Sequence, residues 1–285
     1  MRKQRSPEFK NVVFAGGGSR CFWQAGFWQG ATAYMNIKPM MMGAVSAGAA
    51  MACLISANNV QGGLETFKEG VGRNPRNFYL GDALRRKNPF PHETIYRDAL
   101  ATGLGGENLE RLRKGPELRV LVTKLSGDVG RKYGLVAGYT IYCLKGRISP
   151  SLHAHALRRV GFKPAIRNAR SCNEVGELVS LIMASSSTPP ITPLATIDGS
   201  PALDGGFVDN IPVETVDESL GETLILLSQR YPDGKIPRKS GRTYVQPSRQ
   251  IPVAKWDCTS PDKIQATFDL GLEDGKSFTR RYHLN

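Results

Sequence analysis

Two short apolar runs near the start of the chain each end in a turn of small residues that leads into a helical pattern. The first run, Asn11–Ala15, stops at three consecutive glycines, and a helix is expected over about residues 22–35. The second run, Met40–Val45, is followed at once by a small-residue helix expected over Ala47–Ser56. Buried strands that alternate with helices are typical of a mostly parallel sheet covered on both faces. The sequence therefore predicts the α/β fold class.

The rest of the chain continues the same alternation. A helix is expected over Asn173–Ser185, with Asn173 as a candidate N-cap because its side chain can accept from free backbone N–H groups. Thr196–Leu203 has the pattern of a hairpin that turns at Asp198 and Gly199. Further strands are expected over Leu118–Leu125 and Thr223–Ser228, a further helix from Asp262 onward, and patches of helix within the polar segment 61–115.

The length of 285 residues allows one large domain or two small ones. No change in composition marks a boundary between two domains, so we expect a polar leader over residues 1–9 and a single domain over 10–285. The segment 131–170 is rich in Arg and Lys, with aromatic and apolar residues between them. We expect this segment to be a basic cap or an insertion of that domain.

The charge of the chain is strongly positive, at a formal +13 with a pI near 9.7. Such a surplus favours an anionic partner, either a membrane surface with anionic lipid or a nucleic acid, and a role in solubility alone would give the same composition. The chain has no recognisable DNA- or RNA-binding motif, so no nucleic-acid partner is expected. Its hydrophobic content of 40% excludes a disordered chain.

The cysteines are five in number, scattered, and without CxxC spacing. This pattern disfavours a disulfide framework and a structural zinc site, and it is typical of a reducing compartment. The apolar run after the basic N-terminus is too short for a secretion signal, and no apolar stretch is long enough to cross a bilayer. We therefore expect a cytoplasmic protein without a transmembrane segment, which reaches any lipid ligand from the aqueous side, as a peripheral membrane protein.

A glycine-rich loop, Gly16–Arg20, lies between the first strand and the first helix. Glycines let a backbone approach a ligand closely and expose N–H groups, and the helix N-terminus adds positive potential. Such a loop suits a phosphate or the oxyanion of an acyl-transfer intermediate, although a plain strand-to-helix turn has the same pattern. Neither the Walker A sequence nor the GxGxxG spacing is present, which disfavours a nucleotide site.

Ser46 stands at the second strand-to-helix turn, in the sequence Ala44–Gly48. A serine in a sharp turn of this kind, with small residues two positions before and after it, is typical of a nucleophile elbow. The usual elbow has glycine two positions before the serine, where this chain has Ala44. Taken alone, the pattern fits a helix N-cap serine equally well.

Asp204 is followed by two glycines near the end of the predicted hairpin, a pattern that alone would indicate an ordinary turn. Taken together, the glycine-rich loop, the serine turn and this Asp-Gly-Gly segment resemble the patatin-like phospholipase family in order and spacing. The resemblance covers about residues 11–213, and its motifs are Phe14–Arg20, Gly43–Ala49, the Ala-Ser-rich segment Met183–Pro190, and Asp204–Val213.

The resemblance implies a three-layer α/β/α sandwich with a mostly parallel central sheet, and a Ser–Asp dyad in place of a triad. It also implies a serine hydrolase of the phospholipase A or lysophospholipase type, which cleaves carboxylic esters of lipids at a membrane surface through an acyl-enzyme and needs no metal or cofactor. The implied site consists of Ser46 as nucleophile, Asp204 as base, the backbone of Gly16, Gly17 and Gly18 as oxyanion hole, and Arg20 beside that loop, holding its shape or its charge.

Two positions depart from the family pattern: Cys21 stands where glycine is usual, and Ala44 replaces the first glycine of the elbow. Both residues are small, so a slightly altered loop and elbow are expected. The departures leave a second hypothesis open, a catalytically silent lipid- or anion-binding protein on the same fold. A Ser-Asp-His triad in hydrolase order is disfavoured, because only His283 follows Asp204, close to the C-terminus.

Overall fold

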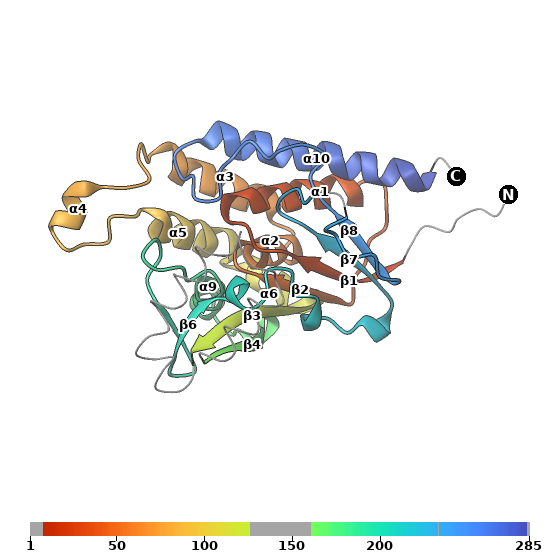
Figure 1. The fold of residues 1–285 in the computed structure, drawn as a ribbon, viewed down its shortest axis with the longest axis horizontal. Helices are drawn as coiled ribbons and strands as arrows, with labels where there is room; N and C mark the ends of the chain where they lie inside the picture. The colour runs from red at the N-terminus through yellow and green to blue at the C-terminus, as the bar shows by residue number, and fades with distance from the viewer. Residues whose placement is uncertain (1–7, 126–160, 233, 284–285) are drawn as a thin grey trace.

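The computed structural model describes residues 8–125, 161–232 and 234–283. Its centre is an eight-stranded sheet flanked by helices (Figure 1). The strands are β1 Phe9–Phe14, β2 Met41–Val45, β3 Glu117–Leu125, β4 Phe162–Asn168, β5 Ala195–Ile197, β6 Ser200–Asp204, β7 Glu222–Leu226 and β8 Arg242–Val245. Neighbouring strands follow the order β5-β6-β3-β2-β1-β7-β8, with β4 paired to β3.

The sheet is parallel in its middle and antiparallel at one side. The pairs β3–β2, β2–β1, β1–β7 and β7–β8 are parallel, whereas β4 and β6 pair antiparallel with β3, and β5 pairs antiparallel with β6. The predicted hairpin is confirmed, and it turns through Asp198 and Gly199, both of which have positive φ. The strand β4 was not predicted, because its sequence lies within the basic segment and contains Pro164.

Alternate side chains of the strands face two separate cores. Val12 and Phe14 of β1 join the large core beneath the helices, whereas Val13 of the same strand packs in a smaller core on the opposite face. The longer helices are α1 Phe22–Thr32, α2 Ala47–Ser56, α3 Val60–Gly72, α5 His92–Leu104, α6 Glu107–Lys114, α9 Val175–Ser185 and α10 Pro261–His283. The predicted three-layer α/β/α fold is confirmed, and among the described residues its second outer layer consists of short 3-10 helices and loops.

The start of α9 differs from the expectation. Asn173 does not cap this helix, whose N-cap is Glu174. Instead the backbone N–H of Asn173 donates to the carboxylate of Glu177 over 2.8 Å. The acidic side chain of the first turn therefore reaches back to the chain before the helix, which is half of a capping box.

The helices α1 and α10 pack backbone against backbone along their length (Figure 1). A Cβ added to Gly26 of α1 would lie 2.0 Å from the carbonyl oxygen of Phe268, and one added to Gly271 of α10 would lie 2.1 Å from that of Trp23. Only glycine permits this approach. Because α1 follows the glycine-rich loop directly, the contact fixes the helix on which that loop is mounted. In the part of the chain that the structure describes, no helix has the length and apolar character of a membrane span.

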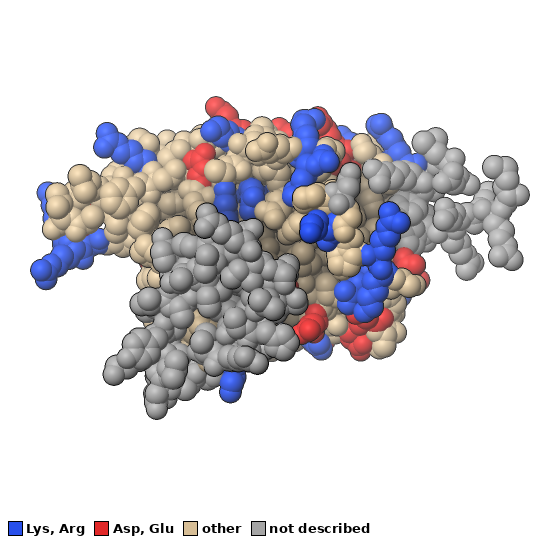
Figure 2. Space-filling model, in the orientation of Figure 1, with Lys and Arg blue, Asp and Glu red and all other residues tan. Residues whose placement is uncertain are grey.

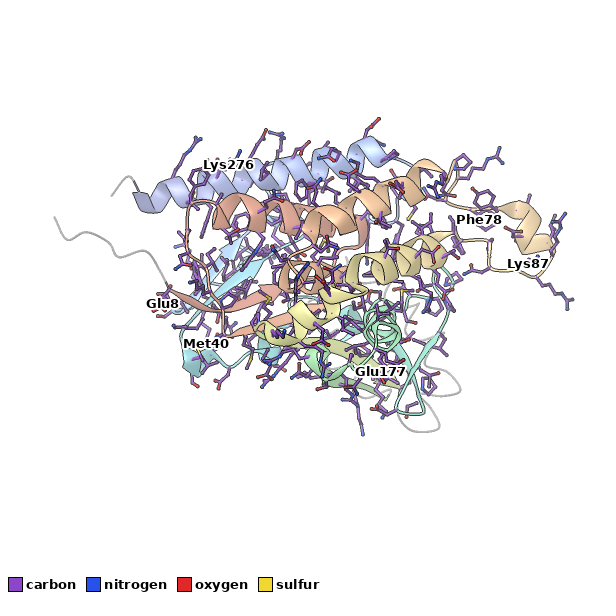
Figure 3. The ribbon with its side chains drawn as sticks, turned by 180° about the vertical axis from the view of Figure 1, so that it is seen from behind. Glu8, Met40, Phe78, Lys87, Glu177 and Lys276 are labelled. Carbon is purple, nitrogen blue, oxygen red and sulfur yellow. The ribbon has the colours of Figure 1, made fainter. Side chains whose placement is uncertain are left out.

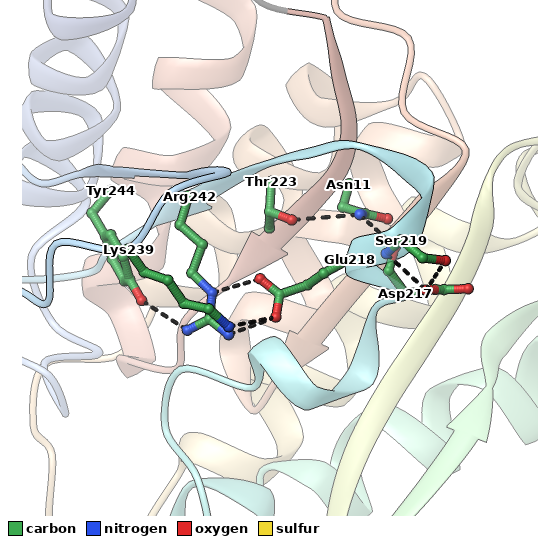
Figure 4. A network of polar contacts seen from close by, with 8 residues as sticks. All are labelled: Asn11, Asp217, Glu218, Ser219, Thr223, Lys239, Arg242 and Tyr244. Atoms are coloured by element: carbon green, nitrogen blue, oxygen red, sulfur yellow. Dashed lines mark hydrogen bonds and ion pairs between the residues drawn. The ribbon is translucent and has the colours of Figure 1, made fainter.

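A polar network joins the amino ends of β1, β7 and β8 (Figure 4). Glu218 accepts hydrogen bonds from the Arg242 guanidinium at 2.6 and 2.7 Å and from Lys239 at 3.2 Å. These cations lower the pKa of Glu218 to about 2, with the Arg242 hydrogen bond as the largest cause. Beside them, the Asn11 amide donates to the carbonyl oxygen of Asp217. This network therefore lies at the opposite ends of the strands from the turns that follow β1 and β2.

Candidate active site

The strands β2 and β6 meet end to end along one edge of β3. Residues 117–121 of β3 pair with β2, residues 122–124 pair with β6, and β4 occupies the other edge. Val45, the last residue of β2, therefore lies opposite Leu121, and Asp204, the last residue of β6, lies opposite Val122. Sheet register thus brings Ser46 to Asp204, although 158 positions separate them in the sequence.

A direct hydrogen bond joins the two predicted residues. The Ser46 hydroxyl donates to Oδ2 of Asp204 over 2.7 Å, and Oδ1 of the same carboxylate accepts from the Gly206 backbone N–H, also over 2.7 Å. Both side chains are buried. The carboxylate is therefore held in one orientation, with one oxygen committed to the backbone and the other to the serine. A buried carboxylate in this position can accept the serine proton.

Ser46 occupies the one-residue turn between β2 and α2, with a φ of 55°. Positive φ is unfavourable for a residue with a side chain and persists only where the surroundings enforce it. The backbone N–H of Ser46 donates to the Ser185 hydroxyl over 2.8 Å, and that hydroxyl donates to the Leu121 carbonyl oxygen over 2.7 Å. Ser185 therefore links the turn to β3. In the sequence, Ser185 stands out only as a member of the Ala-Ser-rich segment, and nothing there indicates this linking role.

The substitution at Ala44 is accommodated by the core. Ala44 is fully buried in β2, opposite Phe14 and Val120 of the neighbouring strands. The glycine that the packing requires in this strand is its neighbour Gly43, where an added Cβ would lie 2.0 Å from Oγ1 of Thr215. The turn after β2 is thus formed with alanine two positions before the serine.

The first two carbonyl groups of the glycine-rich loop accept hydrogen bonds from side chains. The Gly16 carbonyl oxygen accepts from Oγ of Ser228 at 2.5 Å and from Nδ2 of Asn210 at 3.1 Å. The Gly17 carbonyl oxygen accepts from Nε of Arg20 at 3.4 Å. In a trans peptide unit the N–H points opposite to the C=O. These bonds therefore orient the N–H groups of Gly17 and Gly18 away from the side chains that hold the carbonyl groups.

The three glycines predicted for the oxyanion hole, and Arg20 predicted beside them, differ in whether their backbone N–H groups are already bonded. The N–H of Gly16 already donates to the Asn210 carbonyl oxygen. Within the described residues, the N–H groups of Gly17 and Gly18 have no acceptor. The loop lies against the serine, since a Cβ on Gly16 would come within 3.2 Å of the Ser46 Cβ. The geometry therefore leaves Gly17 and Gly18 as donors, while Arg20 holds the loop through the Gly17 carbonyl.

A cavity of about 60 Å³ opens beside the serine. Ser46 and Gly18 are among the residues that line it, and most of its wall is apolar or aromatic. The side chains of that wall come from α1, α2, α3, α5 and the segment before α10, and they are those of Phe22, Met51, Phe67, Tyr96, Trp256 and Cys258. Apolar pockets with a few polar groups are the usual form of a small-molecule or acyl-chain site.

His92 lines the same cavity, a placement that the sequence did not indicate. Its Nε2 lies 2.8 Å from the Trp256 carbonyl oxygen, which can only accept, so Nε2 carries the proton. Burial lowers the pKa of this imidazole and favours its neutral form. Its Nδ1 is then a buried acceptor with no partner among the described residues. One turn further along α5, burial raises the pKa of the Tyr96 phenol, which lies beside Ser186.

Cys21, the second departure from the family pattern, is fully buried behind the loop. Its thiol donates to the Ala15 carbonyl oxygen at 3.5 Å, and burial raises its pKa to about 12. A protonated, enclosed thiol is a poor nucleophile. The residue is the N-cap of α1 and packs in the large core.

The basic segment predicted over 131–170 is described only from residue 161 onward. There Arg167 forms an ion pair with Asp198, and Arg170 donates to the Arg113 carbonyl oxygen over 2.8 Å. The remainder of the segment, with His153 and His155, lies outside the described residues, as does the side chain of His283.

Comparison with known proteins gives one family match. The model of the family described as "Patatin-like phospholipase" matches residues 12–217, which is most of the chain. No curated protein sequence matches. Among solved structures, the crystal structure of VipD from Legionella pneumophila is similar with a TM-score of 0.49 and 12% sequence identity, over 97% of this chain and 68% of that chain.

Proposed function

Because the chain belongs to the patatin-like phospholipase family, we propose that it hydrolyses carboxylic esters of lipids with Ser46 as nucleophile and Asp204 as base. Family membership supports lipid acyl hydrolysis in general. The observation that carries the finer assignment is the 2.7 Å hydrogen bond from the Ser46 hydroxyl to the buried carboxylate of Asp204. No other serine in the described residues combines a strained turn, a carboxylate partner and an adjoining cavity.

The first half of the reaction forms an acyl-enzyme. Oγ of Ser46 attacks the ester carbonyl carbon as Asp204 takes its proton. The negative charge that develops on the carbonyl oxygen is stabilised by the N–H groups of Gly17 and Gly18, and one such donor typically contributes about 3 kcal/mol. When the intermediate collapses, the bond to the leaving alcohol breaks, and the protonated Asp204 returns the proton to that alcohol.

The second half repeats these steps with water. Asp204 takes a proton from a water molecule, whose oxygen attacks the acyl carbon, and the same two N–H groups stabilise the new oxyanion. Collapse releases the fatty acid and returns the proton to Oγ of Ser46. The acyl group passes from the lipid to Ser46 and then to water, and no atom changes its oxidation state, so the cycle needs no external electron donor or acceptor.

The cavity beside Ser46 supports activity of the phospholipase A or lysophospholipase type, with a phospholipid or lysophospholipid as substrate. Its apolar wall, with Phe22, Met51 and Phe67, suits an acyl chain. The buried Nδ1 of His92 provides a hydrogen-bond acceptor in this wall, which suits a substrate that carries a hydroxyl near the reacting ester, as lysophospholipids do.

The test is Ser46→Ala, measured by release of fatty acid from phospholipid and lysophospholipid vesicles and by covalent labelling with a fluorophosphonate, which reacts only with an activated serine. We expect wild-type protein to be labelled and active, and the variant to be unlabelled and inactive with an unchanged melting temperature. Ser180→Ala, at an exposed serine on α9, is the matched control and should retain both properties.

The labelling also separates this proposal from the catalytically silent hypothesis. That hypothesis depended on Ala44 and Cys21, both of which fit in the core without displacing the serine or the loop. Wild-type protein that binds lipid vesicles but takes up no probe and releases no fatty acid would favour the silent protein. Undiminished hydrolysis by Ser46→Ala would contradict the assignment of the nucleophile.

A further inference from the structure

The segment between α3 and α5 extends away from the body of the protein and has the short helix α4 Leu80–Leu84 at its end (Figure 1). We call residues 74–91 the projection. Seen from behind, Phe78 lies on the projection and Lys87 lies near its tip, far from the sheet (Figure 3). Both views show the same extension, so the tip stands clear of the described body.

Apolar side chains at this end are unusually exposed. Seven large apolar side chains are exposed in the described residues, and three of them belong to the projection. Phe78 is 46% exposed, Leu80 is 64% exposed and Leu84 is 78% exposed. Single exposed apolar residues need no explanation, but a cluster on a protruding element is typical of an interaction site.

The same residues are surrounded by positive charge. The projection contains four cations, Arg76, Arg85, Arg86 and Lys87, against one acidic side chain, Asp82. None of the four takes part in an ion pair with the described residues. Figure 2 shows Lys and Arg side chains at this end of the molecule, and further ones elsewhere on the same face. Exposed leucines beside unpaired cations match the two layers of a bilayer surface, acyl chains below and anionic headgroups above.

The base of the projection is held by hydrogen bonds, so its shape is defined. The Tyr79 backbone N–H donates to the Pro89 carbonyl oxygen over 2.9 Å and joins the two limbs. The Asn74 amide donates to the Cys258 carbonyl oxygen over 2.7 Å, and the Cys258 N–H donates to Oδ1 of Asn77 over 2.8 Å. Cys258 also lines the cavity beside the serine.

A row of aromatic rings connects the projection with that cavity. Phe78 contacts Phe90 with ring centroids 5.4 Å apart, Phe90 contacts His92 at 6.1 Å, and His92 contacts Trp256 at 6.2 Å. His92 and Trp256 both line the cavity. The row therefore links the base of the projection to the wall of the candidate active site.

We propose that the projection is the membrane-docking element of this protein, with Leu80 and Leu84 inserted among the acyl chains and Arg85, Arg86 and Lys87 on the headgroups of anionic lipid. Docking would bring the cavity to the lipid surface. The proposal concerns binding and can be tested without catalysis. It goes beyond the proposed hydrolysis, because a catalytically inactive protein would still dock.

Binding is measured by co-sedimentation of the Ser46→Ala protein with phosphatidylcholine vesicles, pure or containing about a third phosphatidylglycerol. We expect clear preference for the anionic vesicles. Removing three cations, as Arg85→Gln with Arg86→Gln and Lys87→Gln, should weaken that binding on the order of 100-fold, because each contributes about 1 kcal/mol near an anionic surface. The pair Leu80→Ser with Leu84→Ser should weaken it by at least about 10-fold.

Two matched controls separate the projection from bulk charge and bulk hydrophobicity. The first removes three exposed cations elsewhere: Lys38→Gln, Lys235→Gln and Arg238→Gln. The second replaces two exposed apolar residues elsewhere, Met40→Ser and Leu194→Ser. Both controls should bind anionic vesicles within about threefold of the parent protein. A parallel loss in controls and projection variants would overturn the proposal, as would unchanged binding in both projection variants.

Activity provides an independent readout when the projection variants carry the native Ser46 instead of Ser46→Ala. The projection variants should hydrolyse a short water-soluble ester at the wild-type rate and should lose hydrolysis of anionic vesicles. Loss on both substrates would contradict a docking role. Failure of wild-type protein to bind any vesicle would overturn the proposal and favour a protein partner for this surface, whereas absence of hydrolysis with intact binding would affect only the proposed catalysis.

Discussion

The two ends of the parallel strands use polar groups differently. At the amino ends, the Glu218 carboxylate is paired with Arg242 and Lys239, and the cluster lies near solvent. At the carboxyl ends, the N–H groups of Gly17 and Gly18 have no acceptor among the described residues, and Ser46 is held at positive φ beside a buried carboxylate. The first arrangement satisfies its charges internally. The second leaves two backbone N–H groups free to bind a ligand and keeps Ser46 in a strained conformation beside them.

This difference follows from the direction of the strands. In a parallel sheet, the turns that leave the carboxyl ends lead into helices, whose first N–H groups point back toward the sheet edge. The loop after β1 and the turn after β2 are two such turns, and β6 delivers Asp204 to the same edge from the opposite direction. At the amino ends, the charged groups of the Glu218 network pair with one another.

The largest effect is expected from Asp204→Asn. The amide preserves the size of the side chain and its bond from the Gly206 N–H but cannot take the serine proton. We expect kcat for acyl-ester hydrolysis to fall on the order of 10³- to 10⁴-fold, with little change in melting temperature. Glu218→Gln at the opposite edge is the matched amide substitution and should leave kcat unchanged. Equal losses of kcat in Asp204→Asn and Glu218→Gln would contradict a functional difference between the two ends of the strands.

Gly18→Ala should have the next largest effect. Gly18 has a φ of 59°, and an added Cβ would lie 2.1 Å from the Lys255 carbonyl oxygen, so the loop must move. We expect kcat to fall on the order of 10²- to 10³-fold, as for loss of one oxyanion donor. Gly106→Ala is the control, because Gly106 has a φ of 60° but open space around it. It should reproduce the backbone strain, about 1 kcal/mol in unfolding free energy, without the loss of activity.

The sequence was sufficient for the local turns of the site and for the elements around them. Strand, turn and helix follow each other within a few residues at Gly16–Arg20 and at Ser46, so composition and order indicate them directly. The end-to-end meeting of β2 and β6 could not be predicted, because it depends on which strands pair along β3. His92 was missed for a similar reason, since its place in the cavity wall depends on how α5 packs against the segment before α10.

Ser185→Ala tests a positioning residue at the carboxyl edge. Its hydroxyl joins the Ser46 N–H to the Leu121 carbonyl oxygen, and its removal leaves both groups buried without that partner. We expect the free energy of unfolding to fall by about 1–3 kcal/mol. If Ser185 also orients the nucleophile, kcat should fall about 10-fold, with KM nearly constant, at a temperature where the variant is fully folded. Ser180→Ala on the same helix is the control, and an unchanged kcat in Ser185→Ala would reduce this residue to a structural role.

The smallest effect is expected at the amino ends of the strands. It is the change in the free energy of unfolding caused by Glu218→Gln, measured as a function of pH. The pKa of Glu218 is lowered from 4.5 to about 2 by Arg242 and Lys239, so the folded protein favours the charged carboxylate. Its contribution to stability is therefore complete above pH 4.5 and is lost as the pH falls from 4.5 toward 2. Because the pair is near solvent, we expect the variant to be destabilised by less than about 1 kcal/mol at neutral pH. Urea titrations should show this difference shrinking toward zero at low pH, whereas a difference that grows at low pH would contradict the ion pairing.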